Sequence, residues 1–374
     1  VWRSINNPIT EDIITSGKDI VDNIYDDNVY YNRKSNETNT KPLRDFHNRF
    51  VKNKIITSVS SRGNTLLDMS VGKAGDIQKW LDSKLSFVLG MDYSKDNIEN
   101  KLDGACVRYI KKKRRIRNMF DALFLHGSAV LNIRNTNAAF DPKGKRIINA
   151  LMGKGEKDKN RLGNGVYKQW GKAMDGFNVI SNQFSIHYFF SDLNSVNDFA
   201  RNCSQNCKID GYVIGTCYDG GKIFDRLKDK NYGEKIFHMI DDKLIWSITK
   251  MYNKAEFNPN ESSLGYKIDV YQESINKYFT EYLVNFEYFK NLMISYGFSL
   301  LTPEECKNIG LKQSIGSFSL LYNDMVNKIK RKHSLKNKYG EATNMSEQEK
   351  DISFLNNYFI FKKTNKVADD NVYN

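Results

Sequence analysis

The sequence predicts an α/β fold built on a mostly parallel, doubly wound sheet. Short apolar runs of strand type alternate with segments of helical periodicity along most of the 374 residues, which is typical of parallel sheets with connecting helices. Two of the apolar runs end in an acidic residue, and the first is followed by a turn of small residues. The carboxyl ends of parallel strands form the ligand-binding edge in such folds, so we expect the functional site there.

The composition narrows the classes of protein to consider. Hydrophobic residues make up 40% of the chain, enough for a sizeable core, and no apolar run approaches the roughly 20 residues of a membrane-spanning helix. The 57 Lys and Arg against 44 Asp and Glu leave a formal net charge of +13, which favours a polyanionic partner such as nucleic acid. The five cysteines are scattered, as in proteins of reducing compartments. We interpret the closest pair, Cys203 and Cys207, as ordinary thiols rather than metal ligands.

The first 40 residues differ in composition from the rest. They end in the polar stretch NRKSNETNT and begin with Val1 rather than Met. We therefore expect residues 1–40 to be an arm or linker of a longer polypeptide, ahead of one domain over residues 41–374. The segment that follows has helical periodicity, and Asn48 and Lys52 share one face of this helix because they lie four residues apart. A merely solvated helix face would also explain these two residues.

The segment TLLDMSVGKAGD, from Thr65 to Asp76, is the most informative stretch. Two leucines of a short strand lead to Asp68, and a turn containing Ser70 and Gly72 leads to the start of a helix. Small residues in a turn allow the backbone to approach a ligand closely, although a purely structural turn would look the same. The next strand, Ser86 to Asp92, also ends in an acid, which could bind a pair of ribose hydroxyls.

This turn does not match the glycine-rich patterns that bind dinucleotides or nucleoside triphosphates. Lys73 precedes Ala74 where a P-loop would end in Gly-Lys-Ser/Thr, and the carboxylate of Asp68 would repel a pyrophosphate. A ligand with a cationic group fits better. We therefore expect S-adenosylmethionine, which carries both an ammonium and a sulfonium group.

The segments that follow continue the alternation of helices and strands. Ser94 is a candidate cap for a helix that runs toward Tyr109, and the basic run KKKRRIR follows this helix. The strand from Met119 to Leu125 places Ser128 just beyond its carboxyl end. Residues 135–175 are rich in Gly and Lys, and we interpret them as an inserted basic loop with only one or two helical turns.

A fourth strand leads to a further group of candidate site residues. Phe177 to Ile180 has the pattern of a strand, and Gln183, His187 and Tyr188 lie beyond its end. A single His among apolar residues is more often a core residue than a ligand contact. Here it follows a strand at the expected binding edge, so we keep it as a candidate.

The rest of the chain extends the predicted order of elements. These are a helix containing Val196 and Phe199, a strand from Asp210 to Thr216, two antiparallel strands at Lys243 to Tyr252 and Gly265 to Tyr271, helices from Glu281 to Phe298 and from Leu320 to Ile329, and a final strand from Asn357 to Lys362. No internal repeat is visible in the sequence.

Several motifs of this chain resemble those of the mRNA cap guanine-N7 methyltransferases, most closely the methyltransferase domain of the multidomain capping enzymes of large DNA viruses. The most specific is the pattern SxQFxxHY within GFNVISNQFSIHYFF. The other matching segments are KPLRDFHNRFVKNKII, LLDMSVGKAGDIQKW, GYVIGT, TEYLV and FIFKK. The resemblance covers most of the chain from about Tyr30 onward.

The resemblance implies a class I S-adenosylmethionine-dependent methyltransferase fold. Its Rossmann-like sheet has seven mostly parallel strands, with inserted antiparallel strands and helices for cap binding. The implied cofactor-binding residues are Lys52, Asp68, Ser70, Gly72, Asp92, Ser128, Gln183 and Tyr188. The implied cap-binding residues are Asn48, His187, Tyr188, Glu281 and Asn356.

Three of these positions depart from the family pattern. Ser70 stands where Gly is usual, and Ser128 stands where an acid usually contacts the adenine. Asn356 occupies the place of an aromatic residue that covers the cap, with Phe354 and Tyr358 nearby. These departures motivate an alternative function, a cap- or RNA-binding domain that keeps the fold without catalysing transfer.

The activity implied by the resemblance is methyl transfer from S-adenosylmethionine to guanine N7 of the GpppN mRNA cap, with S-adenosylhomocysteine as the product. Guanine N7 has a lone pair and no proton to lose, so we expect direct in-line attack without a general base. In this mechanism His187, Tyr188 and Glu281 position the guanine, and no metal takes part.

The resemblance also implies partners and a location. We expect capped mRNA as the substrate and triphosphatase and guanylyltransferase modules in the same polypeptide. The sequence leaves open whether a stimulatory subunit is required. The segment VWRSINNPIT at the start of the chain resembles the end of a guanylyltransferase module. The expected location is the host cytoplasm, in a viral factory, and the virion.

Overall fold

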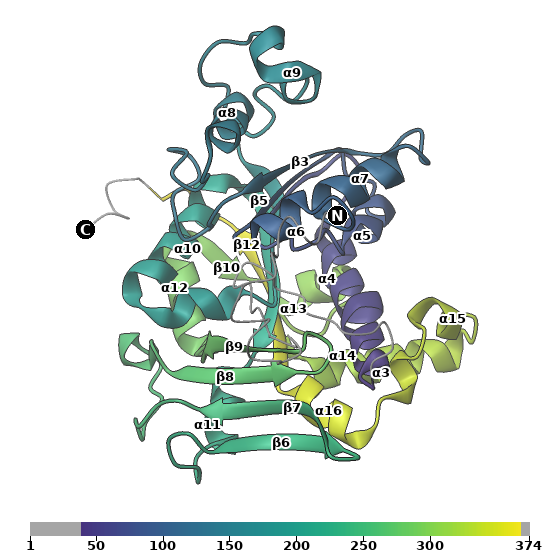
Figure 1. Cartoon of the computed structure of the whole chain (residues 1–374), viewed down its shortest axis with the longest axis vertical. Helices are drawn as coiled ribbons and strands as arrows, with labels where there is room; N and C mark the ends of the chain where they lie inside the picture. The colour runs from purple at the N-terminus through teal and green to yellow at the C-terminus, as the bar shows by residue number, and fades with distance from the viewer. Residues whose placement is uncertain (1–38, 368–374) are drawn as a thin grey trace, which may run out of the picture.

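A computed structural model describes residues 39–367 of the chain (Figure 1). The predicted arm, residues 1–40, lies outside the described residues except for its last two. Within residues 39–367, none of the helices has the length and apolar character that crossing a membrane requires.

Five parallel strands form the centre of the main sheet. They are β1 (Thr65–Asp68), β2 (Phe87–Asp92), β3 (Asp121–His126), β4 (Phe177–Gln183) and β5 (Cys207–Tyr218), and they lie in the order β5-β4-β1-β2-β3. The chain proceeds outward from β1 to β3 and then returns to β4 on the other side of β1. Doubly wound sheets bind ligands at this kind of reversal, beyond the carboxyl ends of the strands.

Three antiparallel strands extend this sheet beyond β5. β12 (Asn356–Lys363) pairs with β5, and both β10 (Phe298–Leu300) and β11 (Ile315–Ser317) pair with β12. The sheet therefore has eight strands, one more than the expected seven, because β11 pairs with part of β12 beside the main path. The mostly parallel α/β class is confirmed.

The central strands are buried on both faces, as parallel strands between helices must be. Leu66 of β1 and Val88 of β2 enter one apolar core, whereas the next residues, Leu67 and Leu89, enter a second core on the opposite face. This alternation explains why these strands read as continuous apolar runs in the sequence. It also leaves their carboxyl ends as the place where polar side chains can gather.

A separate antiparallel sheet has four strands, β6 (Lys235–Ile240), β7 (Lys243–Lys250), β8 (Lys267–Gln272) and β9 (Lys277–Tyr282). The two predicted antiparallel strands correspond to β7 and β8. Sequence reasoning missed β6 and β9, which are half-exposed and carry polar residues at several positions.

The helix predicted from Glu281 begins later than expected. Glu281 belongs to β9, and helix α12 (Phe286–Ser295) starts after Asn285, whose side chain caps the helix by accepting a hydrogen bond from the Tyr288 N–H. Ser94 does cap a helix, but α6 (Lys95–Glu99) ends after one turn and α7 (Ala105–Lys113) begins separately after Gly104. Both corrections concern where a helix starts or stops rather than its existence.

Residues 135–175 are more ordered than the predicted basic loop. Helix α8 (Pro142–Leu151) begins at Asp141, which caps it, and buries Ile147, Ile148 and Leu151 in the core beside the sheet. It therefore serves as the connecting helix between β3 and β4. Helix α9 (Lys159–Tyr167) follows, and Figure 1 shows it at the end of a projection from the body of the molecule.

The remaining helices cover the sheet and form the walls of the site. The first is one continuous helix made of α3 (Lys41–Asp45), a π-helical segment (Phe46–Val51) and α4 (Lys52–Val59). The others are α5 (Ile77–Asp82), a 3-10 helix (Ile186–Ser191), α10 (Leu193–Asn206), α11 (Gly220–Arg226), α13 (Pro303–Asn308), α14 (Phe318–Arg331), α15 (Leu335–Tyr339) and α16 (Glu347–Phe354), with short 3-10 turns at Glu261–Ser263 and Ala342–Asn344.

Candidate active site

A cavity of about 1040 Å³ lies at the carboxyl edge of the parallel strands. Its wall includes the first helix, the turn after β1, the ends of β2 and β4, the residues after β3, and strand β9. Eleven of the twelve predicted site residues line this one cavity. They are Asn48, Lys52, Ser70, Gly72, Asp92, Ser128, Gln183, His187, Tyr188, Glu281 and Asn356.

Asp92 fixes the turn at one end of the cavity. One of its carboxylate oxygens accepts a hydrogen bond from the Gly72 N–H at 2.7 Å, and the other accepts from the Ser94 N–H and the Asn97 side chain at 2.9 and 3.0 Å. Gly72 has a φ of +52°, a conformation that glycine adopts without steric cost. The turn after β1 is thereby tied to the end of β2.

Asp68 is the predicted site residue that lies outside the cavity wall. Its carboxylate sits beneath the turn, 2% exposed, and accepts a hydrogen bond from the Ser70 N–H at 3.1 Å. Burial, reinforced by the nearby negative charge of Asp76, raises the pKa of Asp68 to about 7. In this arrangement Asp68 holds the loop, while its direct contact with a cofactor stays a prediction.

Lys52 reaches the cavity from the first helix and pairs with an acid that sequence reasoning missed. Its ammonium lies 3.4 Å from a carboxylate oxygen of Asp76, whose other oxygen is 2.7 Å from the ammonium of Lys79. Burial alone would raise the pKa of Asp76, but the two ammonium groups outweigh it and lower the pKa to about 2. Asp76 is the last residue of the stretch TLLDMSVGKAGD. Its position directly before the helix that starts at Ile77 was the feature of the sequence that could have marked it as a site residue.

Gln183 and Ser128 contribute fixed polar groups to the same wall. The amide of Gln183, at the end of β4, donates to the Ser181 hydroxyl and accepts from the Thr216 hydroxyl, both at 3.2 Å. The hydroxyl of Ser128, just after β3, accepts from the Val130 N–H at 3.3 Å. Neighbouring parts of the main chain and sheet thus orient both side chains.

The chain turns sharply between Gln183 and His187. Phe184 has a φ of +57°, in the left-handed region that non-glycine residues rarely occupy. Its backbone N–H donates to the Thr216 carbonyl at 2.8 Å, which supports this turn. The following 3-10 helix then carries His187 and Tyr188 into the cavity.

His187 and Glu281 form a buried pair at the other end of the cavity. The Nδ1 atom of His187 lies 3.6 Å from a carboxylate oxygen of Glu281, and the two side chains are 6% and 13% exposed. Burial lowers the pKa of His187 to about 3 and raises that of Glu281 to about 8. Among residues 39–367, neither ring nitrogen of His187 has a hydrogen-bond partner. Burial thus drives both groups toward their uncharged forms, and the pair keeps hydrogen-bonding capacity for a ligand.

The two predicted cap-binding amides are placed differently. Asn48 is exposed at the cavity, and its side chain donates to the Arg44 carbonyl of its own helix at 3.0 Å. Asn356 is 3% exposed, and its side chain donates to the Ser353 carbonyl at 3.0 Å near the end of α16. Asn356 thus joins the cavity wall to the end of α16.

The aromatic residues near Asn356 do not replace the expected cap cover. Phe354 packs against Tyr322, with ring centroids 5.6 Å apart, and the hydroxyl of Tyr358 donates to the Gln313 carbonyl at 3.0 Å. Tyr358 is 1% exposed. Both rings belong to the core beside the cavity.

His47 is a further cavity residue that sequence reasoning missed. Its ring stacks on Phe184, with centroids 5.3 Å apart and planes 18° apart, and its Nε2 atom is 2.8 Å from the Ser353 hydroxyl. Burial, with a smaller effect of the Lys52 charge, lowers the pKa of His47 to about 3. The neutral ring joins the first helix to the turn at Phe184, and its position next to Asn48 was the only hint in the sequence.

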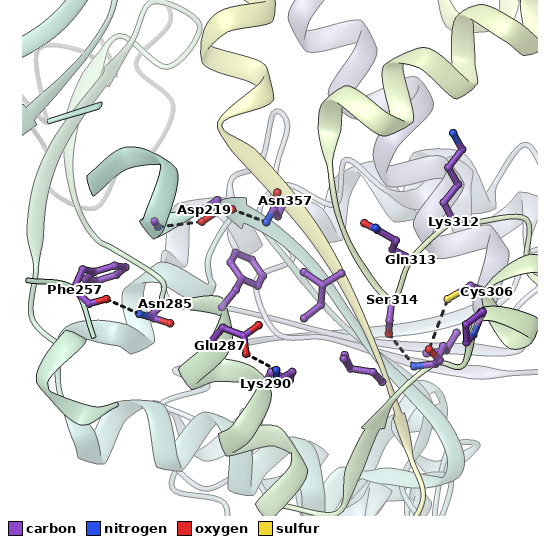
Figure 2. Close-up of a pocket in the computed structure, with 16 residues that line it drawn as sticks. Asp219, Phe257, Asn285, Glu287, Lys290, Cys306, Lys312, Gln313, Ser314 and Asn357 are labelled. Carbon is purple, nitrogen blue, oxygen red and sulfur yellow. Dashed lines mark hydrogen bonds and ion pairs between the residues drawn. The ribbon is translucent and has the colours of Figure 1, made fainter. Parts of the chain in front are cut away.

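A second pocket, of about 690 Å³, is lined by residues of β10, α12 and α13 and by Asn357 of β12 (Figure 2). The side chain of Asn357 donates to the Asp219 carboxylate at 2.8 Å within it, as the dashed line in Figure 2 shows. Asn356 faces the large cavity and Asn357 the second pocket, as expected for successive strand residues. The second pocket contains none of the predicted site residues.

The sequence of residues 11–364 matches the profile of the mRNA (guanine-N(7))-methyltransferase domain. The chain belongs to this family. The match spans nearly the whole chain, so the cap methyltransferase resemblance is confirmed, and with it the class I methyltransferase fold with S-adenosylmethionine as the cofactor of this family.

Individual relatives agree with the assignment to the cap methyltransferase family. A probable mRNA-capping enzyme of Acanthamoeba polyphaga mimivirus is 27% identical over 98% of this chain, and an mRNA cap guanine-N(7) methyltransferase of Candida glabrata is 25% identical over 78% of it. The aligned parts span 32% and 62% of those two proteins. A solved S-adenosylmethionine-dependent methyltransferase from Clostridium acetobutylicum is 10% identical, with a TM-score of 0.44, over 88% of this chain and 94% of that one.

Proposed function

We propose that this chain transfers a methyl group from S-adenosylmethionine to N7 of the guanine in a GpppN mRNA cap. The observation that supports this most is that a single cavity holds both the turn fixed by Asp92 and the buried pair of His187 and Glu281. One end suits a nucleoside with a charged amino-acid tail, and the other suits a flat base with hydrogen-bond donors on its edge.

The residues at the first end fit S-adenosylmethionine, which supplies an activated methyl group on a sulfonium sulfur. The carboxylate of Asp92 has lone pairs that would accept hydrogen bonds from the ribose hydroxyls. Lys52 would bind the carboxylate of the amino-acid moiety, and Asp76 beside it would favour the ammonium group. The wall is completed by Ser70, Gly72, Ser128, Gln183 and Tyr188.

The residues at the second end fit guanine. Glu281 would accept hydrogen bonds from guanine N1–H and the 2-amino group, His187 would bind the same base edge, and Tyr188 would line both ends of the cavity. A base without these donors would leave Glu281 buried and unpaired, which costs free energy. Asn48, on the exposed helix face of the cavity, would complete the contact.

The transfer needs positioning rather than proton transfer. Guanine N7 attacks in line through its lone pair and loses no proton, so the chain supplies no general base. Holding the base and the methyl group in a near-attack arrangement can contribute about 7–11 kcal/mol to lowering the barrier. His187, Tyr188 and Glu281 are therefore positioning residues in this proposal.

Methyl transfer from labelled S-adenosylmethionine to GpppA-capped RNA tests the proposed function. The chain should label this RNA and should leave the same RNA with an m7GpppA cap unlabelled, because its N7 is already methylated. Labelling of both RNAs would place the methyl group elsewhere. Binding of RNA without labelling of either would favour a non-catalytic cap- or RNA-binding domain, the alternative that Ser70 and Ser128 motivate.

We also propose that the chain works as part of a larger capping enzyme. The mimivirus relative is named as a probable mRNA-capping enzyme, and the aligned region is about a third of its length. Triphosphatase and guanylyltransferase modules in the same polypeptide, a stimulatory subunit, and a location in the host cytoplasm, in viral factories, and in the virion follow from this view. Copurification of these activities with the full-length protein from infected cells would test it.

A further inference from the structure

The charge of this chain is not spread evenly over the segments around the cavity. Residues 325–340 contain six Lys or Arg and no Asp or Glu. Five of the six are exposed, and none of these five forms an ion pair within the described part of the chain. They are Lys330, Arg331, Lys332, Lys336 and Lys338, which we call the basic ridge.

Helix stability explains only part of this charge. Lys328, Lys330 and Arg331 lie in the last turn of α14, where cations interact favourably with the helix dipole, and Lys328 also pairs with Asp324 at 2.7 Å. Lys332 lies just beyond the end of α14, and Lys336 and Lys338 lie on the short helix α15. Lys336 and Lys338 also lie in the last turn of their helix, but none of these three exposed lysines forms an ion pair within residues 39–367.

The basic ridge is attached to the helix that forms one wall of the cavity. The ring of Tyr339, at the end of α15, packs edge-on against Phe50 of the first helix, with centroids 5.0 Å apart. Figure 1 shows α15 beside α3. From the same first helix, Arg44 and Asn48 line the cavity. A chain leaving the guanine end of the cavity across this helix would meet the ridge next.

Arg44 provides a link between the cavity and the basic ridge. Within residues 39–367 its guanidinium forms no ion pair, whereas the neighbouring Lys41 and Arg49 both pair with Asp45, at 3.7 and 3.0 Å. An uncompensated guanidinium at the cavity wall suits a phosphate group.

The basic projection around α9 is a weaker candidate for the same role. Residues 141–175 contain nine Lys or Arg, but they also contain four Asp or Glu. Arg161 is paired with both Glu156 and Asp158, and Figure 1 shows α9 at the far end of the molecule from α15. The projection is therefore both more neutralised and farther from the guanine end.

We infer that the basic ridge binds the phosphate backbone of the RNA that follows the cap. This inference rests on the proposed function, because the cap in the cavity sets where the RNA chain begins. The contacts are electrostatic and independent of sequence, so their contribution should depend on RNA length and on salt.

Two matched triple variants of the full chain test the inference. One changes Lys332, Lys336 and Lys338 to Gln on the ridge, and the control changes Lys159, Lys168 and Lys172 to Gln on the α9 projection. Each removes three exposed positive charges. Affinity for a GpppA-capped RNA of about 20 nucleotides is measured by fluorescence anisotropy over a range of salt concentrations, and methylation is measured with the GpppA dinucleotide.

The ridge variant should bind the long RNA on the order of tenfold more weakly, and its slope of log affinity against log salt should fall by about 2, because each phosphate contact on single-stranded RNA contributes about 0.7. Methylation of the dinucleotide should be unchanged, and the control variant should stay within about twofold of the wild type. Equal losses in both variants would overturn the inference in favour of a net-charge effect.

An unchanged ridge variant would also overturn it, and would favour an acidic protein surface as the partner. Failure of the wild-type chain to methylate the dinucleotide would contradict the proposed function instead, while the salt slopes still decide whether the ridge binds RNA.

Discussion

The acids at the cofactor end of the cavity already have hydrogen-bond or ion-pair partners, whereas the ring nitrogens of His187 at the guanine end accept and donate no hydrogen bond within residues 39–367. Asp92 accepts three hydrogen bonds and Asp76 lies between two ammonium groups. His187 and Glu281 are buried together without comparable partners in the described part of the chain, and burial drives both toward their neutral forms. The cofactor end is thus assembled before any ligand arrives, while the guanine end depends on the ligand to satisfy its polar groups. Under the proposed function, this difference would place base specificity at the guanine end.

The largest expected effect comes from removing the carboxylate at the guanine end. Glu281→Ala should lower kcat/KM for GpppA-capped RNA more than about 100-fold, because both hydrogen bonds to the guanine edge are lost and the buried donors of the base are left unpaired. Binding of S-adenosylhomocysteine, measured by calorimetry, should remain within about twofold of the wild type. Glu287→Ala, at an exposed acid beside the second pocket, serves as the control and should have little effect. Loss of cofactor binding together with transfer would contradict the separation of the two ends.

At the cofactor end, Asp92→Ala should weaken binding of S-adenosylhomocysteine by roughly ten- to hundredfold. The change removes the acceptor for the ribose and also frees the turn that the Gly72 N–H anchors. Affinity for GpppA should be nearly unchanged, and Asp82→Ala, at an exposed acid, should affect neither ligand. An Asp92 variant that loses GpppA binding but keeps cofactor binding would reverse the assignment of the two ends.

Binding at the guanine end should also depend on pH. The pKa of Glu281 is raised to about 8, so its carboxylate ionises as pH rises through 8, and the ionised form is the better acceptor for guanine. GpppA affinity should therefore increase from pH 6.5 to 8.5, by at most about tenfold per pH unit below 8. The same linkage lowers the free energy of unfolding as pH rises from 4.5, the ordinary pKa of Glu, to about 8, because burial opposes ionisation of Glu281 in the folded chain. Glu281→Gln should flatten the binding profile, and an unchanged profile would show that another group titrates.

The smallest expected effect concerns the serine in the turn. Ser70→Gly removes a buried hydroxyl that has no hydrogen-bond partner among the described residues, but it adds backbone freedom in the unfolded chain. These effects oppose each other, so cofactor affinity should change less than about threefold and the free energy of unfolding by less than about 1 kcal/mol. A gain of tenfold or more in cofactor affinity would show that Ser70 obstructs the site.

The parts of the fold that could be predicted from the sequence are those with local signals. The strands ending at Asp68 and Asp92 are apolar on both faces, and the turn between β1 and α5 carries its own small residues. Strands β6 and β9 were missed because half-exposed strands lack a continuous apolar run. The same omission produced the error at Glu281, which read as part of a helix although it lies on β9.

The site residues, too, could be predicted only where the sequence carries a local signal or a family motif. His187 and Glu281 are 94 positions apart, and only the resemblance to cap methyltransferases linked them before the structure placed them 3.6 Å apart. The pairing of Lys52 with Asp76 and the stacking of His47 on Phe184 are tertiary contacts with no local signature. The sequence also could not show on which side of the turn the side chain of Asp68 lies.

A structure of the chain with S-adenosylhomocysteine and GpppA bound together tests the central claim most directly. The account predicts the cofactor ribose at Asp92, the guanine edge within hydrogen-bonding distance of Glu281, and N7 turned toward the cofactor sulfur with room for one methyl group between them. Guanine bound outside this cavity, for example in the pocket lined by Asp219 and Asn357, would contradict the account. So would guanine bound in the cavity with N7 turned away from the sulfur.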